Sequence, residues 1–259
     1  MTFRLAVVGG GNMGAALVGG MLRAGWNPSD LAVVEVVAAR AAVLREEFPG
    51  VHVASEVPPC EAVLVAVKPP DVAGAVRAGV AAGARRVLSI AAGVTLARLQ
   101  EVAGAAVVIR AMPNTPALVG EGVAGVCGGP TATAADLEWA EEILGSVGTV
   151  VRVGEPHLDA VTGLVGSGPA YLFLVAEALI DAGVLAGLSR ATSEAMVTQL
   201  FVGSAALLRD RGDAAHLRAM VTSPGGTTAA GLRVLEDRAV RAAFLEAVVA
   251  ATRRSAELG

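Results

Sequence analysis

The 259-residue sequence has one lysine, two cysteines and few aromatic side chains. Only 17% of its residues are charged, and the formal net charge is −4. Because there is no basic surface to follow a phosphate backbone, we expect no nucleic-acid partner. Cys60 and Cys127 lie outside any CxxC or histidine-rich cluster, and the three histidines have no metal-ligand spacing. The sequence therefore predicts no disulfide framework and no metal site, and it favours a reducing, cytoplasmic location.

An uncharged run of 18 residues lies between Arg4 and Arg23, which is the length of a signal segment or a short membrane span. Six of these residues are glycines, and Asn12 stands among them. Glycine is a poor helix former and would leave the backbone poorly supported in lipid. We therefore expect no membrane role. Hydrophobic residues make up 54% of the chain, which excludes disorder for most of its length.

Short apolar runs recur through the first half of the chain, at residues 4–9, 31–36, 62–67, 87–90 and 106–109. These runs are continuous rather than alternating, which is typical of strands covered on both faces. Segments of helical character separate several of them; the first spans Asn12 to Ala24 and ends at Gly25. The pattern predicts an α/β domain with a mainly parallel sheet.

The composition changes near residues 154–156, and we predict two domains, residues 1–154 and 155–259. Residues 160–208 carry only four charges, a pattern that we interpret as helices interrupted at 166–169 and 187–189. A solvent-facing helix normally carries a charged stripe, so these helices must bury more than one face. In a chain of this size a second copy is the natural cover, which predicts an obligate homodimer through an all-α C-terminal domain.

A glycine-rich motif follows the first apolar run, where residues 9–14 fit G-x-G-x-x-G. A helical pattern comes next, and Glu35 stands 21 residues beyond Gly14. This context is typical of a dinucleotide-binding turn. The first glycine, Gly9, permits the tight turn; the second, Gly11, lets the backbone approach a pyrophosphate; and Gly14 lets the helix pack closely.

Glu35 is expected at the end of the second strand, where an acid accepts hydrogen bonds from ribose hydroxyls and repels a 2′-phosphate. Arg40 would neutralise such a phosphate if its loop folds back. These residues leave NADH and NADPH equally open.

Lys68 follows the third apolar run and precedes Pro69 and Pro70, so it belongs to the sheet edge where ligands bind. It is either part of a rigid loop at the nicotinamide half of the coenzyme or a solvated surface lysine.

Residues 221–231 begin as a loop and continue as a helical pattern. Serine and threonine hydroxyls, with glycine N–H groups at a helix start, can form a cradle for a small carboxylate. The alternative is a plain capping motif with Pro-Gly turn chemistry.

Taken in order, these motifs cover nearly the whole chain. They are residues 9–14, 66–69, 89–94, 110–116, 166–171, 222–228 and 232–236. With them the sequence resembles the pyrroline-5-carboxylate reductases, and the last motifs are more specific than the first. The resemblance implies a Rossmann-like N-terminal domain and a helical domain that interlocks with a partner subunit, in dimers that can associate further into decamers. It also implies reduction of the C=N bond of 1-pyrroline-5-carboxylate to L-proline with NADPH or NADH.

The resemblance also assigns roles to individual residues. Those that would hold the pyrophosphate are Gly9, Gly11, Asn12, Met13 and Gly14. Those that would line the nicotinamide side are Lys68, Pro69, Ala92 and Gly93. Those that would cradle the substrate carboxylate are Ser223, Gly225, Gly226 and Thr227. The Thr228 hydroxyl would bond the ring nitrogen as the catalytic group. Because a protonated imine is already electrophilic, neither a metal nor a His–Asp pair is required.

Two alternatives and one departure stand beside this interpretation. Hydroxyacid dehydrogenases of the same plan use a lysine in the helical half, and residues 69–259 contain none. A non-catalytic NAD(P) sensor would have no need of the 222–228 cradle. Many members of the resembled family have an asparagine just after the third strand, where residues 53–56 here offer none, so the coenzyme preference stays open.

Overall fold

The computed structural model describes residues 1–258, which form two compact units. The first unit contains residues 1–167 and the C-terminal segment that begins at Val249. The second contains residues 168–248.

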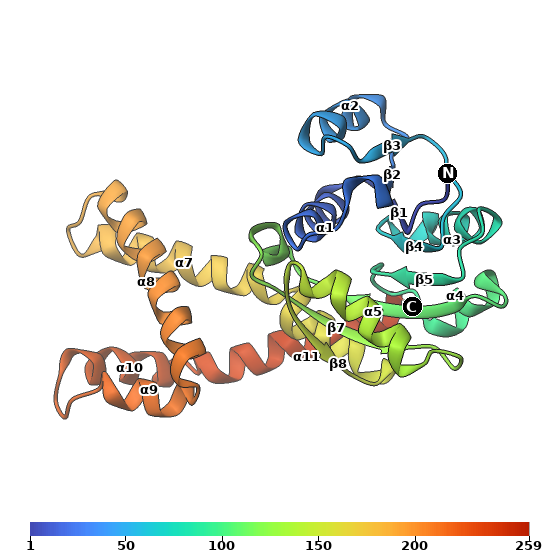
Figure 1. Ribbon diagram of the computed structural model, residues 1–259. Coiled ribbons are helices and arrows are strands. Elements are labelled where there is room, and N and C mark those ends of the chain that lie inside the picture. The colour runs from blue at the N-terminus through green and yellow to red at the C-terminus, as the bar shows by residue number, and fades with distance from the viewer. Residues whose placement is uncertain (259) are drawn as a thin grey trace. The chain divides into compact units, whose positions relative to one another are not determined.

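The first unit is built on an eight-stranded sheet with the order β3-β2-β1-β4-β5-β6-β7-β8 (Figure 1). Its strands are β1 Leu5–Val8, β2 Leu31–Val34, β3 His52–Ala54, β4 Ala62–Val65, β5 Arg86–Ser89, β6 Val107–Met112, β7 Gly122–Gly128 and β8 Gly148–Arg152. All neighbouring strands are parallel except β6 and β7, which are antiparallel. The predicted Rossmann-like, mainly parallel sheet is confirmed, and the strand order reverses between β1 and β4, where such sheets bind ligands.

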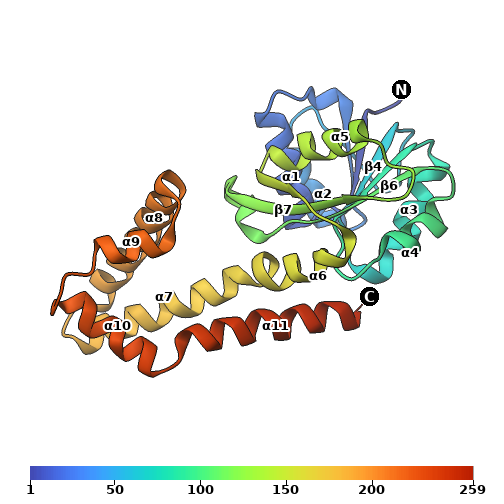
Figure 2. The same ribbon diagram turned by 90° about the horizontal axis from the view of Figure 1, so that it is seen from below.

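Helices cover both faces of this sheet (Figure 2). They are α1 Asn12–Arg23, α2 Ala38–Glu47, α3 Val72–Ala81, α4 Leu96–Ala103, α5 Ala134–Gly145 and α6 Leu158–Val161, with 3-10 turns at Pro28–Asp30, Pro69–Asp71, Thr115–Val119 and Glu155–His157. Along β1, Leu5 and Val7 pack into the core under α1 and α5, whereas Ala6 and Val8 pack into the core under α3 and α4. Burial on both faces explains why this strand is an unbroken apolar run.

Three strands, β3, β7 and β8, lie outside the five predicted apolar runs. In β7 the obstacle is its three glycines, because glycine normally weakens a strand. Close packing explains the glycine at position 125, because a Cβ there would lie 3.0 Å from Val161, the last residue of α6. In addition, β6 continues to Met112, three residues beyond the predicted run.

The second unit is entirely helical. It contains α7 Gly168–Leu185, α8 Arg190–Arg211, α9 Ala214–Met220, α10 Thr227–Asp237 and the first part of α11 Val240–Leu258. The predicted interruptions are confirmed: a π-helical turn at Thr162–Gly166 precedes α7, and a break separates α7 from α8. The two helices approach closely where a Cβ at Gly183 would lie 2.5 Å from Ser193 Oγ.

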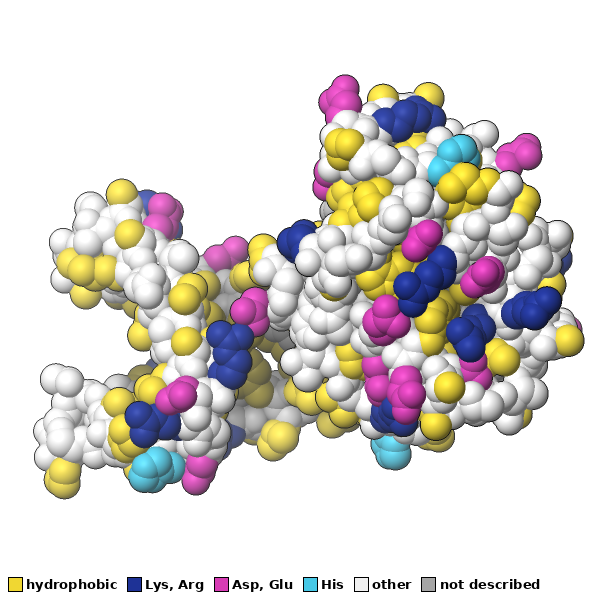
Figure 3. Space-filling view, viewed as in Figure 1, with side chains coloured by type: hydrophobic (Ala, Val, Ile, Leu, Met, Phe, Trp, Pro, Cys, Tyr) yellow, Lys and Arg dark blue, Asp and Glu magenta, His cyan; other side chains and the backbone are white. Residues whose placement is uncertain are grey.

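The apolar side chains of α7 are uncovered within a single chain. No residue of α7 is buried, and Phe173 and Leu174 are each 66% exposed. Figure 3 shows hydrophobic side chains distributed over the helices of this unit. The stretch Glu155–Leu185 is long and apolar enough to cross a membrane by length and composition alone. Helices buried between subunits share that composition, since obligate interfaces resemble a protein core.

Candidate active site

The turn between β1 and α1 has the geometry that its glycines predict. Gly9 has a φ of +106°, and a Cβ there would lie 2.5 Å from the Ala66 carbonyl oxygen. A Cβ at Gly14 would overlap the Gly9 carbonyl oxygen. These two glycines therefore let β1, the turn and α1 come together, which a larger residue would prevent.

Gly11 stands in contrast because its surroundings are open. A Cβ at this position would meet no atom within 4 Å, and Gly11 is the N-cap of α1 with no side-chain cap hydrogen bond. Asn12 is exposed, while Met13 packs partly against the core. The start of α1 thus offers backbone N–H groups beside open space, an arrangement that fits a pyrophosphate.

Glu35 and Arg40 bond the two backbone polar groups of Gly10, its N–H and its carbonyl oxygen. Glu35 Oε2 accepts a hydrogen bond of 3.2 Å from Gly10 N, and its Oε1 accepts one of 2.8 Å from Val37 N. Arg40 Nε donates to the Gly10 carbonyl oxygen at 2.7 Å. The acid predicted at the end of β2 therefore lies beside the glycine turn, and the Arg40 side chain is turned toward the same glycine.

The predicted nicotinamide-side residues follow two neighbouring strands. Lys68 and Pro69 come after β4 and are exposed, and Asp71 N donates to the Lys68 carbonyl at 2.9 Å to close a 3-10 turn. Ala92 and Gly93 follow β5. Since β1, β4 and β5 are parallel neighbours, these loops share the sheet edge with the glycine turn.

The end of α11, at Leu258, lies against the turn after β5 (Figure 1). Gly93 has a φ of +76°, and a Cβ there would lie 3.2 Å from the Leu258 carbonyl oxygen at the end of α11. Gly93 is buried by this contact, while Ala92 is half-buried.

The predicted substrate cradle is a tight turn leading into α10. Gly226 N donates to the Ser223 carbonyl at 3.0 Å, and Gly225 has a φ of +67°. Gly226 is the N-cap of α10 without a side-chain cap, so Thr227 and Thr228 form the first turn of the helix. The predicted transition from loop to helix is confirmed. The binding of a substrate carboxylate by this turn stays a prediction. These residues belong to the second unit, and the predicted coenzyme residues belong to the first.

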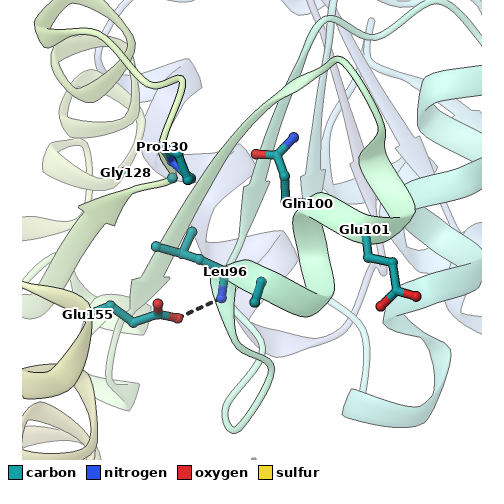
Figure 4. Close-up of a pocket in the computed structure, with 8 residues that line it drawn as sticks. Leu96, Gln100, Glu101, Gly128, Pro130 and Glu155 are labelled. Carbon is teal, nitrogen blue, oxygen red and sulfur yellow. Dashed lines mark hydrogen bonds between the residues drawn. The ribbon is translucent and has the colours of Figure 1, made fainter.

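Sequence reasoning missed a partly buried ion pair between Arg110 and Glu155. Arg110, on β6, is 6% exposed and donates to Glu155 Oε1 at 3.1 Å. The same oxygen accepts a hydrogen bond of 2.6 Å from Leu96 N at the start of α4 (Figure 4). Burial, with Glu155 nearby, raises the pKa of the Cys127 thiol to about 11, although Arg110 acts in the opposite direction. The sequence held one signal of this pair, because Arg110 stands within the otherwise apolar residues 107–111 and a buried arginine needs a partner.

The cavity beside this ion pair has a volume of about 710 Å³ (Figure 4). Glu155, Gln100 and Pro130 are among its lining residues, which include none of the predicted coenzyme or substrate residues within 1–258. We therefore assign the Arg110–Glu155 pair to the fold, where it fixes the start of α4 against β6.

Comparisons with known proteins agree with these features. Residues 4–93 match the family described as NADP oxidoreductase coenzyme F420-dependent, and residues 155–258 match the pyrroline-5-carboxylate reductase dimerisation family. The pyrroline-5-carboxylate reductase of Synechocystis is 42% identical over 100% of this chain and 99% of that protein. The enzyme of Corynebacterium melassecola is 40% identical over 98% of each.

Solved structures give the same result. The pyrroline-5-carboxylate reductase of Coxiella burnetii superposes with a TM-score of 0.92 at 33% identity, covering 100% of this chain and 99% of that one. The Plasmodium falciparum enzyme, solved with NADP bound, gives 0.86 at 30% identity, covering 99% and 98%. A 3-hydroxyisobutyrate dehydrogenase of Mycobacterium tuberculosis, at 17% identity with a TM-score of 0.51 over 73% of this chain and 67% of that one, shares the fold alone. By its sequence over the full length and by its fold, this chain belongs to the pyrroline-5-carboxylate reductase family.

Proposed function

We propose that the chain reduces the C=N bond of 1-pyrroline-5-carboxylate to give L-proline, with NADPH or NADH as the hydride donor. The observation that carries this proposal is the likeness to reductases of that name over the whole chain, together with the open glycine turn at Gly11. The same full-length likeness favours an enzyme over a coenzyme sensor and over a hydroxyacid dehydrogenase.

The coenzyme is held at the carboxyl edge of the sheet. Gly9, Gly11 and Gly14 shape the turn, and the N–H groups at the start of α1, with Asn12 and Met13, bind the pyrophosphate. Glu35 faces the adenosine ribose. The residues after β4 and β5, Lys68, Pro69, Ala92 and Gly93, line the nicotinamide side. Bound NAD(P)H supplies the hydride that the imine carbon receives.

The second ligand is held by the turn before α10. The residues of that turn, Ser223, Gly225, Gly226 and Thr227, bind the substrate carboxylate with hydroxyl and backbone N–H groups. The Thr228 hydroxyl bonds the ring nitrogen, which keeps its proton as the C=N bond becomes C–N. The protein contributes mainly by positioning the two reactants, with one hydroxyl oriented at the nitrogen.

Self-association accompanies this activity, since residues 155–258 match a dimerisation family. The uncovered apolar faces of the second unit supply the surface that a partner subunit buries. The dimers associate further into decamers, and the protein works in the cytoplasm without a membrane or nucleic-acid partner. We place the boundary between the two functional domains after residue 154. The match of residues 155–258 to the dimerisation family supports this placement, and the division into compact units lies later, after Ser167.

The test is to incubate the purified protein with 1-pyrroline-5-carboxylate and either reduced coenzyme, following coenzyme absorbance and identifying proline by mass. Turnover to proline is expected. Coenzyme binding without turnover would favour a sensor. If the protein instead oxidised a hydroxyacid with NAD(P)⁺ and did not reduce 1-pyrroline-5-carboxylate, a dehydrogenase would be favoured.

A further inference from the structure

A cavity of about 460 Å³ lies at the carboxyl ends of β2 and β3. Its lining includes Glu35, Arg45, Ser55 and Glu56. Because Glu35 also bonds the Gly10 N–H, this cavity adjoins the glycine turn. In a sheet of this topology the end of the second strand meets the adenosine ribose of a dinucleotide. The adenosine half of the coenzyme therefore belongs here.

The carboxylate of Glu35 is fixed in this cavity. Its two oxygens accept hydrogen bonds from Gly10 N and Val37 N, at 3.2 and 2.8 Å. Each carboxylate oxygen can accept more than one hydrogen bond, so the group can still receive ribose hydroxyls. A movement of this carboxylate away from a bound phosphate would break both hydrogen bonds.

Glu35 forms no ion pair within residues 1–258, and neither does Glu56, which also lines the cavity and is exposed. Arg40 lies outside the cavity lining. Its Nε donates to the Gly10 carbonyl at 2.7 Å, and its charge is paired with Glu47 at 3.8 Å.

One guanidinium lines the cavity, together with the imidazole of His52. Arg45 donates to the Val53 carbonyl at 3.3 Å, and His52 lies at the start of β3. The lining therefore holds two carboxylates against one guanidinium, a local excess of negative charge. A 2′-phosphate would add about two further negative charges at this place.

We infer that this cavity selects NADH over NADPH, with Glu35 as the specificity-determining residue. The inference rests on the proposed function and narrows its coenzyme. Ribose hydroxyls donate to Glu35, whereas a 2′-phosphate meets a fixed carboxylate of like charge. The P. falciparum relative was solved with NADP, so the fold admits the phosphate, and the preference depends on the residues at this cavity.

The experiment compares kcat/KM for NADH and NADPH in the wild type and in variants at Glu35. Glu35→Gln keeps the size and one acceptor oxygen, so it preserves the turn while it removes the charge; Glu35→Ser also opens space. Glu56→Gln changes the second carboxylate, which holds no other group. Glu46→Gln is the matched control, because it makes the same charge change on α2 outside the cavity lining.

The wild type is expected to favour NADH by at least about tenfold, and Glu35→Gln to reduce that ratio by about tenfold, a change of about 1.4 kcal/mol. Glu56→Gln should shift the ratio less in the same direction, and Glu46→Gln should leave it unchanged. A wild type that favours NADPH, or a ratio that neither Glu35 variant moves, would overturn the inference.

A binding measurement separates this inference from the proposed function. Adenosine 5′-monophosphate and adenosine 2′,5′-bisphosphate compete for the adenosine site without any hydride chemistry. The monophosphate should bind the wild type more tightly, and Glu35→Gln should narrow the difference. If the monophosphate binds more tightly while neither coenzyme is oxidised, the proposed function fails and the inference about Glu35 stands. Tighter binding of the bisphosphate would contradict the inference and leave the proposed function untouched.

Discussion

Ser255 and Asp159 lie 96 positions apart in the chain and are joined by a hydrogen bond, with Ser255 Oγ donating to Asp159 Oδ1 at 2.7 Å. Ser255 is 4% exposed, and it belongs to the last turn of α11. Three residues later, Leu258 contacts Gly93 in the turn after β5. The bond therefore fixes the end of α11 beside a loop that we propose to line the nicotinamide.

Replacing Ser255 by alanine should lower stability and loosen that loop. The carboxylate would lose a buried donor, which costs about 1–2 kcal/mol for a half-buried group. Thermal unfolding of Ser255→Ala measures the loss, and KM for the coenzyme should rise more than kcat falls. Arg253→Ala, on the exposed side of the same helix, should stay within about 0.5 kcal/mol of the wild type. If the losses in free energy of unfolding caused by Ser255→Ala and Asp159→Ala simply add in the double variant, the hydrogen bond between the two side chains contributes nothing to stability.

Gly11→Val should fold and fail to bind the coenzyme. Gly11 has a φ of −66° and open surroundings, so a side chain is tolerated, at an N-cap cost of about 1 kcal/mol. That side chain would fill the space meant for the pyrophosphate. Titration should show at least about 100-fold weaker coenzyme binding, about 2.7 kcal/mol.

Gly14→Ala serves as the comparison, because it should lower the stability of the fold itself rather than coenzyme binding alone. Its Cβ would overlap the Gly9 carbonyl, so a large loss of thermal stability is expected. Unchanged coenzyme affinity in Gly11→Val would remove the phosphate-binding role from the start of α1.

Gly11 and Gly14 show which features of the fold and the site the sequence could predict. The turn at residues 9–14 and the turn at 223–226 follow from local backbone demands, which glycine spacing reports directly. The strand β7 could not be predicted from its glycines, because the need for glycine at position 125 comes from Val161, which lies far along the chain. The Arg110–Glu155 pair was missed for the same reason, since its partners are 45 residues apart.

Thr228→Ala should lower kcat by about 10–100-fold, the lower range for a group that handles a proton. Binding of the coenzyme should be unaffected, because Thr228 is proposed to bond the substrate nitrogen rather than the coenzyme. Thr228→Ser keeps the hydroxyl and should recover most of the rate. Thr222→Ala is the control, because its hydroxyl donates to the Arg218 carbonyl at 2.6 Å and is already engaged. Equal turnover in Thr228→Ala and the wild type would rule out the assigned role.

Leu174→Glu on α7 should break the subunit interface. Leu174 is 66% exposed in a single chain, and burying such a side chain against a partner is worth about 1.5–3 kcal/mol. Sedimentation at micromolar concentration should show the wild type as a dimer or larger and the variant shifted to smaller species or precipitated. Glu101→Arg, an exposed charge change on α4, should keep the wild-type assembly. A folded wild-type monomer at that concentration would contradict the proposed interface.

The two cysteines predict how stability changes at alkaline pH. Burial raises the pKa of Cys60 to about 11, and burial is also the main reason that the pKa of Cys127 reaches about 11. In the unfolded chain both thiols have their ordinary pKa of 9.0, so between about pH 9 and 11 the unfolded state loses protons that the folded state retains. Stability should therefore be intact below pH 9 and fall as the pH rises through this range. Few other groups interfere, because the chain has a single lysine and a single tyrosine. Urea unfolding at a series of pH values measures the fall, and Cys60→Ala should make it shallower. Rapid alkylation of both thiols in the folded protein at pH 8 would show that they are neither buried nor protonated.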